Sequence, residues 1–258
     1  PLTKTLSGRD LKAGEFTFEL IEAVSGKVVG SAANTADGSV SLPGVVFEAP
    51  GSYAYLVREL AGTTGGVTYD SRVYAAVATV VDNGDGTLGV SWAVTEPAVG
   101  PVEAMVFENT YAAQPTSVQI SAGKMLLGRD LAAGEFQFAL TALDSAPMPE
   151  GATDGVQTVA NDEHGNAQFG VIDYAQAGEY RYTVSEVKGD AEGVTYDETE
   201  HAVAVRVADN GEGQLLATVD YGDGEQGVVF TNTYTKPEEP DTPDTPDQPD
   251  TPDQPKPN

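Results

Sequence analysis

The sequence predicts an all-β protein made of two tandem β-sandwich domains followed by a disordered tail. Three observations support this class: sequence blocks of the first half recur in order in the second half, apolar residues alternate with a period of two, and residues 237–258 repeat Pro, Asp and Thr. A period of two is that of a β-strand, whose successive side chains point to opposite faces. The 258 residues are enough for two domains of ordinary size.

The internal repeat divides the chain into homologous domains at 1–113 and 114–236. The spacing between matching blocks changes along the chain, which places short insertions in the loops between them. The matching blocks are GRDLKAGEFTFEL (8–20) and GRDLAAGEFQFAL (128–140), GVTYD (66–70 and 193–197), DNGDG (82–86) and DNGEG (209–213), and FENTY (107–111) and FTNTY (230–234).

Within each repeat, short alternating runs such as FTFEL, SYAYLV, EYRYTV and HAVAVRVA are separated by Gly, Pro, Asn and Asp, and no long amphipathic helix interrupts them. This pattern is typical of an antiparallel sandwich of the immunoglobulin-like kind. DNGDG and DNGEG are expected to be tight hairpin turns. A calcium loop is disfavoured because Gly84 and Gly86 stand where ligands are needed.

After Lys236 the sequence becomes a polar, proline-rich repeat that offers nothing to bury. Residues 237–258 are therefore predicted to be a disordered, extended spacer.

The composition limits the possible partners and chemistry. There are 40 acidic and 13 basic residues, a formal net charge of -27 that repels nucleic acid and anionic membranes. Solubility explains this charge, and a cation-recruiting surface is the alternative. The absence of cysteine excludes disulfides, thiolate metal sites and cysteine nucleophiles. No apolar run approaches the roughly 20 residues of a membrane span.

Three polar residues in each repeat fall on the core-facing side of a predicted strand. Alternation places the lysine of the opening strand, the glutamate of the middle strand and the asparagine of the closing strand among apolar neighbours. These residues are Lys4, Glu59 and Asn109 in the first repeat and Lys124, Glu186 and Asn232 in the second. A single inward polar residue has ordinary structural explanations, but three together are costly unless they are paired or neutralised.

A chemical reaction between these groups removes the buried charge. Burial favours the neutral, nucleophilic form of a lysine and the protonated form of a glutamic acid. An amine held against the Asn carboxamide, with a Glu that polarises the carbonyl and shuttles protons, can form an amide and release ammonia. The product would join the first strand of each domain to its last.

The same residues resemble a known family. The lysine-containing first strand followed by GRDL and GEF, the pattern Y-x-Y-x-V-x-E and the closing F-x-N-T-Y occur in both repeats. In this combination they resemble the streptococcal pilin isopeptide-linkage domain family, related to the CnaB-type domains of Gram-positive pilins and adhesins. The resemblance implies an inverse immunoglobulin-like fold and a Lys–Asn isopeptide bond in each domain. The implied bonds are Lys4–Asn109 and Lys124–Asn232, with Glu59 and Glu186 as the catalytic acids.

The implied function is structural: stalk domains of a Gram-positive cell-surface pilin or adhesin, whose bonds resist force and proteases. Apart from single-turnover bond formation no enzyme activity is expected, and no cofactor or metal site is. His164 and His201 have no counterparts in the first repeat, and no G-x-S-x-G motif occurs. Whether the parent is a polymerised pilin or a single-chain adhesin stays open.

The expected partners are other domains or subunits of the same surface protein, with a host ligand bound through a separate tip domain. The acidic, proline-rich tail looks like the wall-spanning stretch that precedes a sortase signal. No LPxTG motif is present, so an extracellular, wall-anchored location is inferred rather than seen.

The alternative function is a ligand-binding adhesin module that recognises host protein or glycan through loops at the sandwich ends. The loop at 146–162 is the longest difference between the repeats, but it lacks the clustered aromatic residues expected of a glycan platform.

Overall fold

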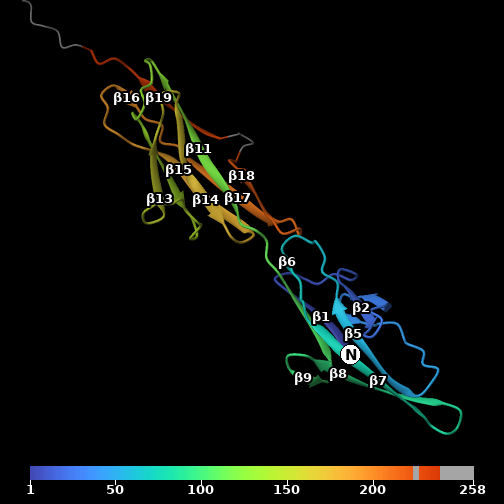
Figure 1. Ribbon diagram of the computed structural model, residues 1–258. Coiled ribbons are helices and arrows are strands. Elements are labelled where there is room, and N and C mark those ends of the chain that lie inside the picture. The colour runs from blue at the N-terminus through green and yellow to red at the C-terminus, as the bar shows by residue number, and fades with distance from the viewer. Residues whose placement is uncertain (223–226, 239–258) are drawn as a thin grey trace, which may run out of the picture.

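The computed structural model describes residues 1–222 and 227–238, and within these ranges it contains strands and turns but no helix. The all-β class predicted from the sequence is confirmed. The predicted spacer at 237–258 lies outside the described residues except for its first two positions. Figure 1 shows the strands gathered into two bodies that lie end to end, with the N-terminal residues in the lower one.

The first domain is a sandwich of two sheets, ordered β4-β1-β10-β6 and β3-β2-β5-β7-β8-β9. Its core contains apolar side chains from both sheets, including Leu2 and Phe107 from one and Phe18 and Val57 from the other. The strands are β1 (Leu2–Ser7), β2 (Thr17–Glu22), β3 (Val28–Ala33), β4 (Ser39–Val40), β5 (Gly51–Glu59), β6 (Val67–Thr68), β7 (Val73–Asp82), β8 (Leu88–Glu96), β9 (Gly100–Val102) and β10 (Met105–Tyr111).

The second domain repeats this plan with sheets ordered β14-β11-β19-β16 and β13-β12-β15-β17-β18. Its core again joins both sheets, for example Ile120 and Phe230 with Phe138 and Val184. The strands are β11 (Thr116–Leu127), β12 (Gln137–Ala142), β13 (Val156–Ala160), β14 (Asn166–Tyr174), β15 (Gly178–Val187), β16 (Val194–Thr195), β17 (Glu200–Asp209), β18 (Leu215–Asp220) and β19 (Val228–Tyr234).

In each domain the first and last strands are parallel neighbours. β1 pairs with β10 so that Lys4 lies opposite Phe107, and β11 pairs with β19 so that Lys124 lies opposite Phe230. All the other strand pairs in these sheets are antiparallel. The chain therefore enters each domain at one end of this strand pair and leaves at the other.

The DNGDG and DNGEG segments form hairpin turns, as predicted. The first joins β7 to β8 and the second joins β17 to β18. In each turn the leading aspartate, Asp82 or Asp209, accepts a hydrogen bond of 2.8 Å from the N–H of the glycine two residues later. That glycine has a positive φ in both turns, which explains why glycine stands there.

The expectation that residues 146–162 form a loop is wrong for part of this range. Residues Val156–Ala160 form β13, an edge strand that pairs with β12, and Val159 packs against the core. β13 occupies the place that β3 has in the first domain. The extra residues of the second repeat thus lie before an edge strand that both domains share.

The two domains meet through the turn that joins β17 to β18. The Tyr111 hydroxyl donates to Asp209 Oδ1 at 2.6 Å and accepts from the Gly213 N–H at 3.0 Å. The connector residue Gln114 adds two backbone hydrogen bonds, its N–H to the Gly213 carbonyl (2.8 Å) and its carbonyl to the Leu215 N–H (3.0 Å). The turn of the second domain is therefore fixed against the last strand of the first.

Candidate functional site

In the first domain, Lys4, Glu59 and Asn109 meet in the core. Their relative exposures are 1%, 6% and 2%. Lys4 Nζ donates to Glu59 Oε2 at 2.7 Å, and Asn109 Nδ2 donates to Glu59 Oε1 at 2.6 Å. One carboxylate thus bridges the amine and the amide.

The second domain contains the same arrangement. Lys124 Nζ donates to Glu186 Oε2 at 2.7 Å, and Asn232 Nδ2 donates to Glu186 Oε1 at 2.7 Å. These three side chains are also buried. All six residues singled out in the sequence therefore lie in two equivalent clusters.

Strand register explains why the three side chains converge. Because Lys4 pairs with Phe107 across the parallel ladder, Asn109 lies two residues further along β10 on the same inward face. Glu59 is the last residue of β5 in the facing sheet, so its carboxylate approaches both from across the core. The Phe16 ring centroid lies 4.7 Å from Lys4 Nζ and covers the amine.

Burial makes each lysine a better nucleophile. Desolvation lowers the pKa of Lys4 from its ordinary value of 10.5, although the hydrogen bond and charge of Glu59 act in the opposite direction. The pKa of Lys124 is lowered by the same dominant cause and opposed by Glu186. The neutral amine is therefore populated at a lower pH than in a free lysine.

A backbone N–H holds the carbonyl oxygen of each asparagine, a feature that strand alternation does not predict. Asp70 N–H donates to Asn109 Oδ1 at 2.7 Å, and Asp197 N–H donates to Asn232 Oδ1 at 2.7 Å. The expectation that the glutamate polarises this carbonyl is corrected here, because the glutamate contacts the amide nitrogen instead. An N–H at this position can stabilise negative charge that develops on the oxygen.

The Asp70 side chain fixes the position of its own backbone N–H. Its carboxylate accepts hydrogen bonds from the N–H groups of Arg72 (2.8 Å) and Glu108 (2.7 Å), which ties the segment after β6 to β10. Asp197 does the same in the second domain through Thr199 and Thr231. The recurring GVTYD block, which ends on this aspartate, was the sequence signal for it.

The GRDL and GEF motifs fold the segment that covers the buried lysine. Arg9 pairs with Glu15 and lies over the Tyr111 ring at 4.7 Å. Gly8 has a φ of 92°, and a Cβ there would lie 2.0 Å from the Tyr111 carbonyl oxygen, so no other residue fits. Arg129, Glu135 and Gly128 repeat these contacts in the second domain.

A buried asparagine, also missed from the sequence, holds the same segment in each domain. Asn34 Oδ1 accepts from Phe16 N–H at 2.8 Å, and its Nδ2 donates to the carbonyls of Lys12 (2.8 Å) and Thr35 (2.9 Å). Asn161 makes the equivalent three contacts. These bonds place the aromatic side chain that follows GE over the lysine.

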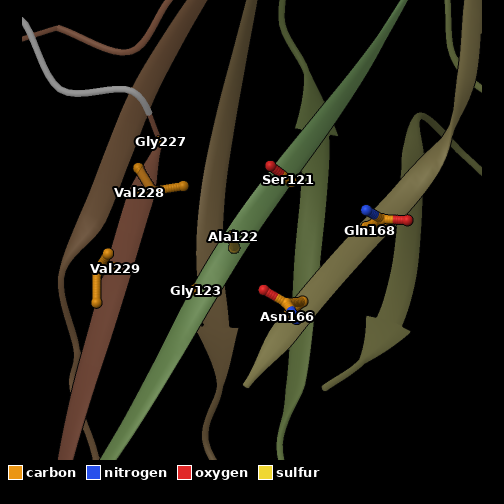
Figure 2. Close-up of a pocket in the computed structure, with 8 residues that line it drawn as sticks. All are labelled: Ser121, Ala122, Gly123, Asn166, Gln168, Gly227, Val228 and Val229. Atoms are coloured by element: carbon orange, nitrogen blue, oxygen red, sulfur yellow. The ribbon is translucent and has the colours of Figure 1, made fainter. Parts of the chain in front are cut away.

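Two other features of the described residues, a hollow in the second domain and His201, offer no comparable chemistry. A depression of about 320 Å³ lies across β14, β11 and β19, and Figure 2 shows the residues that line it. Its lining is small or amide side chains and contains no titratable group: Ser121, Ala122, Gly123, Asn166, Gln168, Gly227, Val228 and Val229. His201 packs edge-on against Phe230. In residues 1–222 and 227–238, no three His, Cys, Asp or Glu side chains are grouped to hold a metal ion.

Comparison with known proteins agrees with this geometry. A family model described as the Spy0128-like isopeptide containing domain, FctA, matches the chain twice, at residues 1–112 and 120–235. The chain belongs to this family. The two matches to the FctA family together span both sandwiches.

Solved pilin structures are also similar to this chain. The major pilin of Streptococcus pyogenes is 16% identical, with 90% of this chain and 96% of that chain covered and a TM-score of 0.35. The minor pilin GBS52 of Streptococcus agalactiae is 12% identical, with 93% and 99% covered and a TM-score of 0.29. The pilus adhesin SpaC of Lactobacillus rhamnosus GG is 16% identical, with 90% and 30% covered and a TM-score of 0.26. No curated protein matches the chain.

Proposed function

We propose that each domain forms an intramolecular isopeptide bond, Lys4–Asn109 in the first and Lys124–Asn232 in the second. The single observation that carries this proposal is the buried glutamate that bridges the lysine amine and the asparagine amide in both domains. Glu59 and Glu186 act as the catalytic acids. Membership of the FctA family supports the same assignment.

The reaction proceeds within each core. The glutamate takes a proton from the lysine ammonium, and the neutral Nζ attacks the asparagine Cγ. The oxyanion that forms is stabilised by the N–H of Asp70 or Asp197. The glutamate then donates this proton to the departing nitrogen, the Cγ–Nδ2 bond breaks and ammonia leaves. The glutamate takes the second proton from the attacking nitrogen, which leaves a neutral amide and a protonated glutamic acid. Each site reacts once, so the protein is not an enzyme that turns over an external substrate.

The two bonded domains would serve as stalk segments of a Gram-positive cell-surface pilin or adhesin. Pilin relationship and surface location follow from the family, while wall anchoring through a sortase signal is part of the proposal. No part of the described chain forms a helix that could cross a membrane. Each bond would connect the strand where load enters a domain directly to the strand where load leaves it.

Intact-protein mass spectrometry tests the chemistry. The wild-type mass should be lower than the sequence mass by two ammonia molecules, and Glu59→Ala and Glu186→Ala should each restore one of them. Glu179→Ala is the matched control, because Glu179 is exposed and lies on the same strand as Glu186. A wild-type mass equal to the sequence mass would refute both bonds and leave the ligand-binding alternative to pursue.

A further inference from the structure

The first domain contains an apolar groove beside the start of β1. The groove encloses about 520 Å³ and is lined mainly by apolar side chains from both sheets. Its lining includes Pro1, Leu42, Val45, Phe47, Trp92 and Met105. Trp92 is 47% exposed there, although Tyr55 and Phe47 pack against its ring.

In the second domain the corresponding space is filled by the first half of β11. Residues 116–119 pair antiparallel with residues 171–174 of β14. Ile120 is fully buried in the core, and Val118 packs against it. Figure 2 shows the residues that follow, Ser121–Gly123, where β11 reaches β19 while it still pairs with β14.

The strand registers of the two domains correspond residue by residue around Leu2 and Ala122. Leu2 lies between Val40 and Met105 in the first sheet, as Ala122 lies between Ala167 and Val228 in the second. The groove therefore begins where β1 starts, at the position that Ile120 fills in the second domain.

The segment beside the groove shows the same difference. Residues 42–47 correspond to 169–174, but they form no strand pairing, whereas 171–174 pair with β11. Val45 and Phe47 are only half-buried, while their counterparts Ile172 and Tyr174 are fully buried. Both the apolar side chains and the backbone of residues 42–47 are thus placed to receive a strand.

We propose that this groove is the binding site of an extended strand that continues β1 backward from Pro1 and carries apolar residues at alternate positions. Pro1 already stands in strand register, because its carbonyl accepts the Met105 N–H at 2.9 Å. A strand that continues β1 backward from Pro1 runs along the groove, as residues 116–120 do before Ala122. The apolar lining selects side chains like Val118 and Ile120 at the two inward positions.

The single tryptophan of the chain is a built-in reporter for this proposal. The full chain is extended before Pro1 with the sequence of residues 115–120, PTSVQI. A matched control extension carries serine at the valine and isoleucine positions. The PTSVQI extension should shift Trp92 emission to shorter wavelength and reduce its quenching by acrylamide, whereas the serine extension should leave both unchanged.

Two results would overturn the proposal. One is an emission spectrum that is the same for the unextended chain and both extended chains, or that shifts equally with both extensions. The other is an emission of the unextended chain that shifts to shorter wavelength as its concentration rises, which would make a second copy the occupant. Circular dichroism of each chain checks that it folds, and the intact mass reports the isopeptide bonds separately, so the two proposals can fail independently.

Discussion

The positions of the two proposed bonds predict how far the chain extends when its ends are pulled. Because β1 and β10 are parallel neighbours, the pull enters at one end of the pair and leaves at the other, and their ladder is loaded in shear. A bond between Lys4 and Asn109 would carry the force past that ladder, so the residues between Lys4 and Asn109 would bear none of it. The perturbations are Glu59→Gln and Glu186→Gln, which keep the size of the side chain but remove its ability to shuttle a proton.

The magnitude follows from the length of chain that each bond encloses. Each loop contains about 100 residues, which extend to roughly 350 Å once the domain unfolds. Closing a loop of this length also removes unfolded-state entropy worth about 4.7 kcal/mol, by analogy with a disulfide. The substitution should therefore convert a domain that does not extend into one that releases roughly 350 Å.

Single-molecule force spectroscopy on the full chain measures this directly. The wild type should show no step of this length, each single variant should show one, and the double variant should show two. Glu179→Gln should behave as the wild type. Steps of this length in the wild-type chain would refute the proposed load path.

Three further predictions concern the chemistry, the covering segment and the domain junction. Burial lowers the pKa of Lys4 and Lys124. The rate of bond formation should therefore fall as the pH drops through the lowered pKa, and it should be constant above that pKa. Timed mass spectra of a chain made by cell-free synthesis measure this rate. Asn161→Ala leaves the Phe136 N–H and two carbonyls without partners, and should lower the free energy of unfolding by about 3 kcal/mol in denaturant titrations of the Glu186→Gln chain. Tyr111→Phe removes the hydroxyl between Asp209 and Gly213, so small-angle scattering should show a wider range of domain orientations, whereas Tyr234→Phe at the equivalent outer position should not.

Strand alternation was sufficient to find the six buried polar residues. Lys4 and Lys124 stand between apolar residues two positions away on either side, and the same holds for the two asparagines. Because a strand fixes the side-chain direction at every position, this pattern places a polar group inside without knowledge of the tertiary structure. The parallel register that aligns lysine with asparagine could not be read in this way, since it depends on pairing between distant strands.

The supporting groups were harder to predict for a physical reason. The recurring GVTYD block marks the position of Asp70, but the group that acts there is a backbone N–H, and the repeat does not say which atom of the block is used. Asn34 and Asn161 lie in irregular segments just after strands, where alternation gives no direction. The division of 146–162 into a loop and the edge strand β13 likewise depends on pairing with β12.

The junction between the domains joins two different surfaces, a turn on one side and a tyrosine with its connector on the other. Such a heterologous contact has no twofold axis. A rotation combined with a translation relates one domain to the next across this contact. The pair of domains therefore has a direction, with two different ends. A change at Tyr111 or Asp209 would therefore alter the pitch of any longer array of these domains rather than its composition.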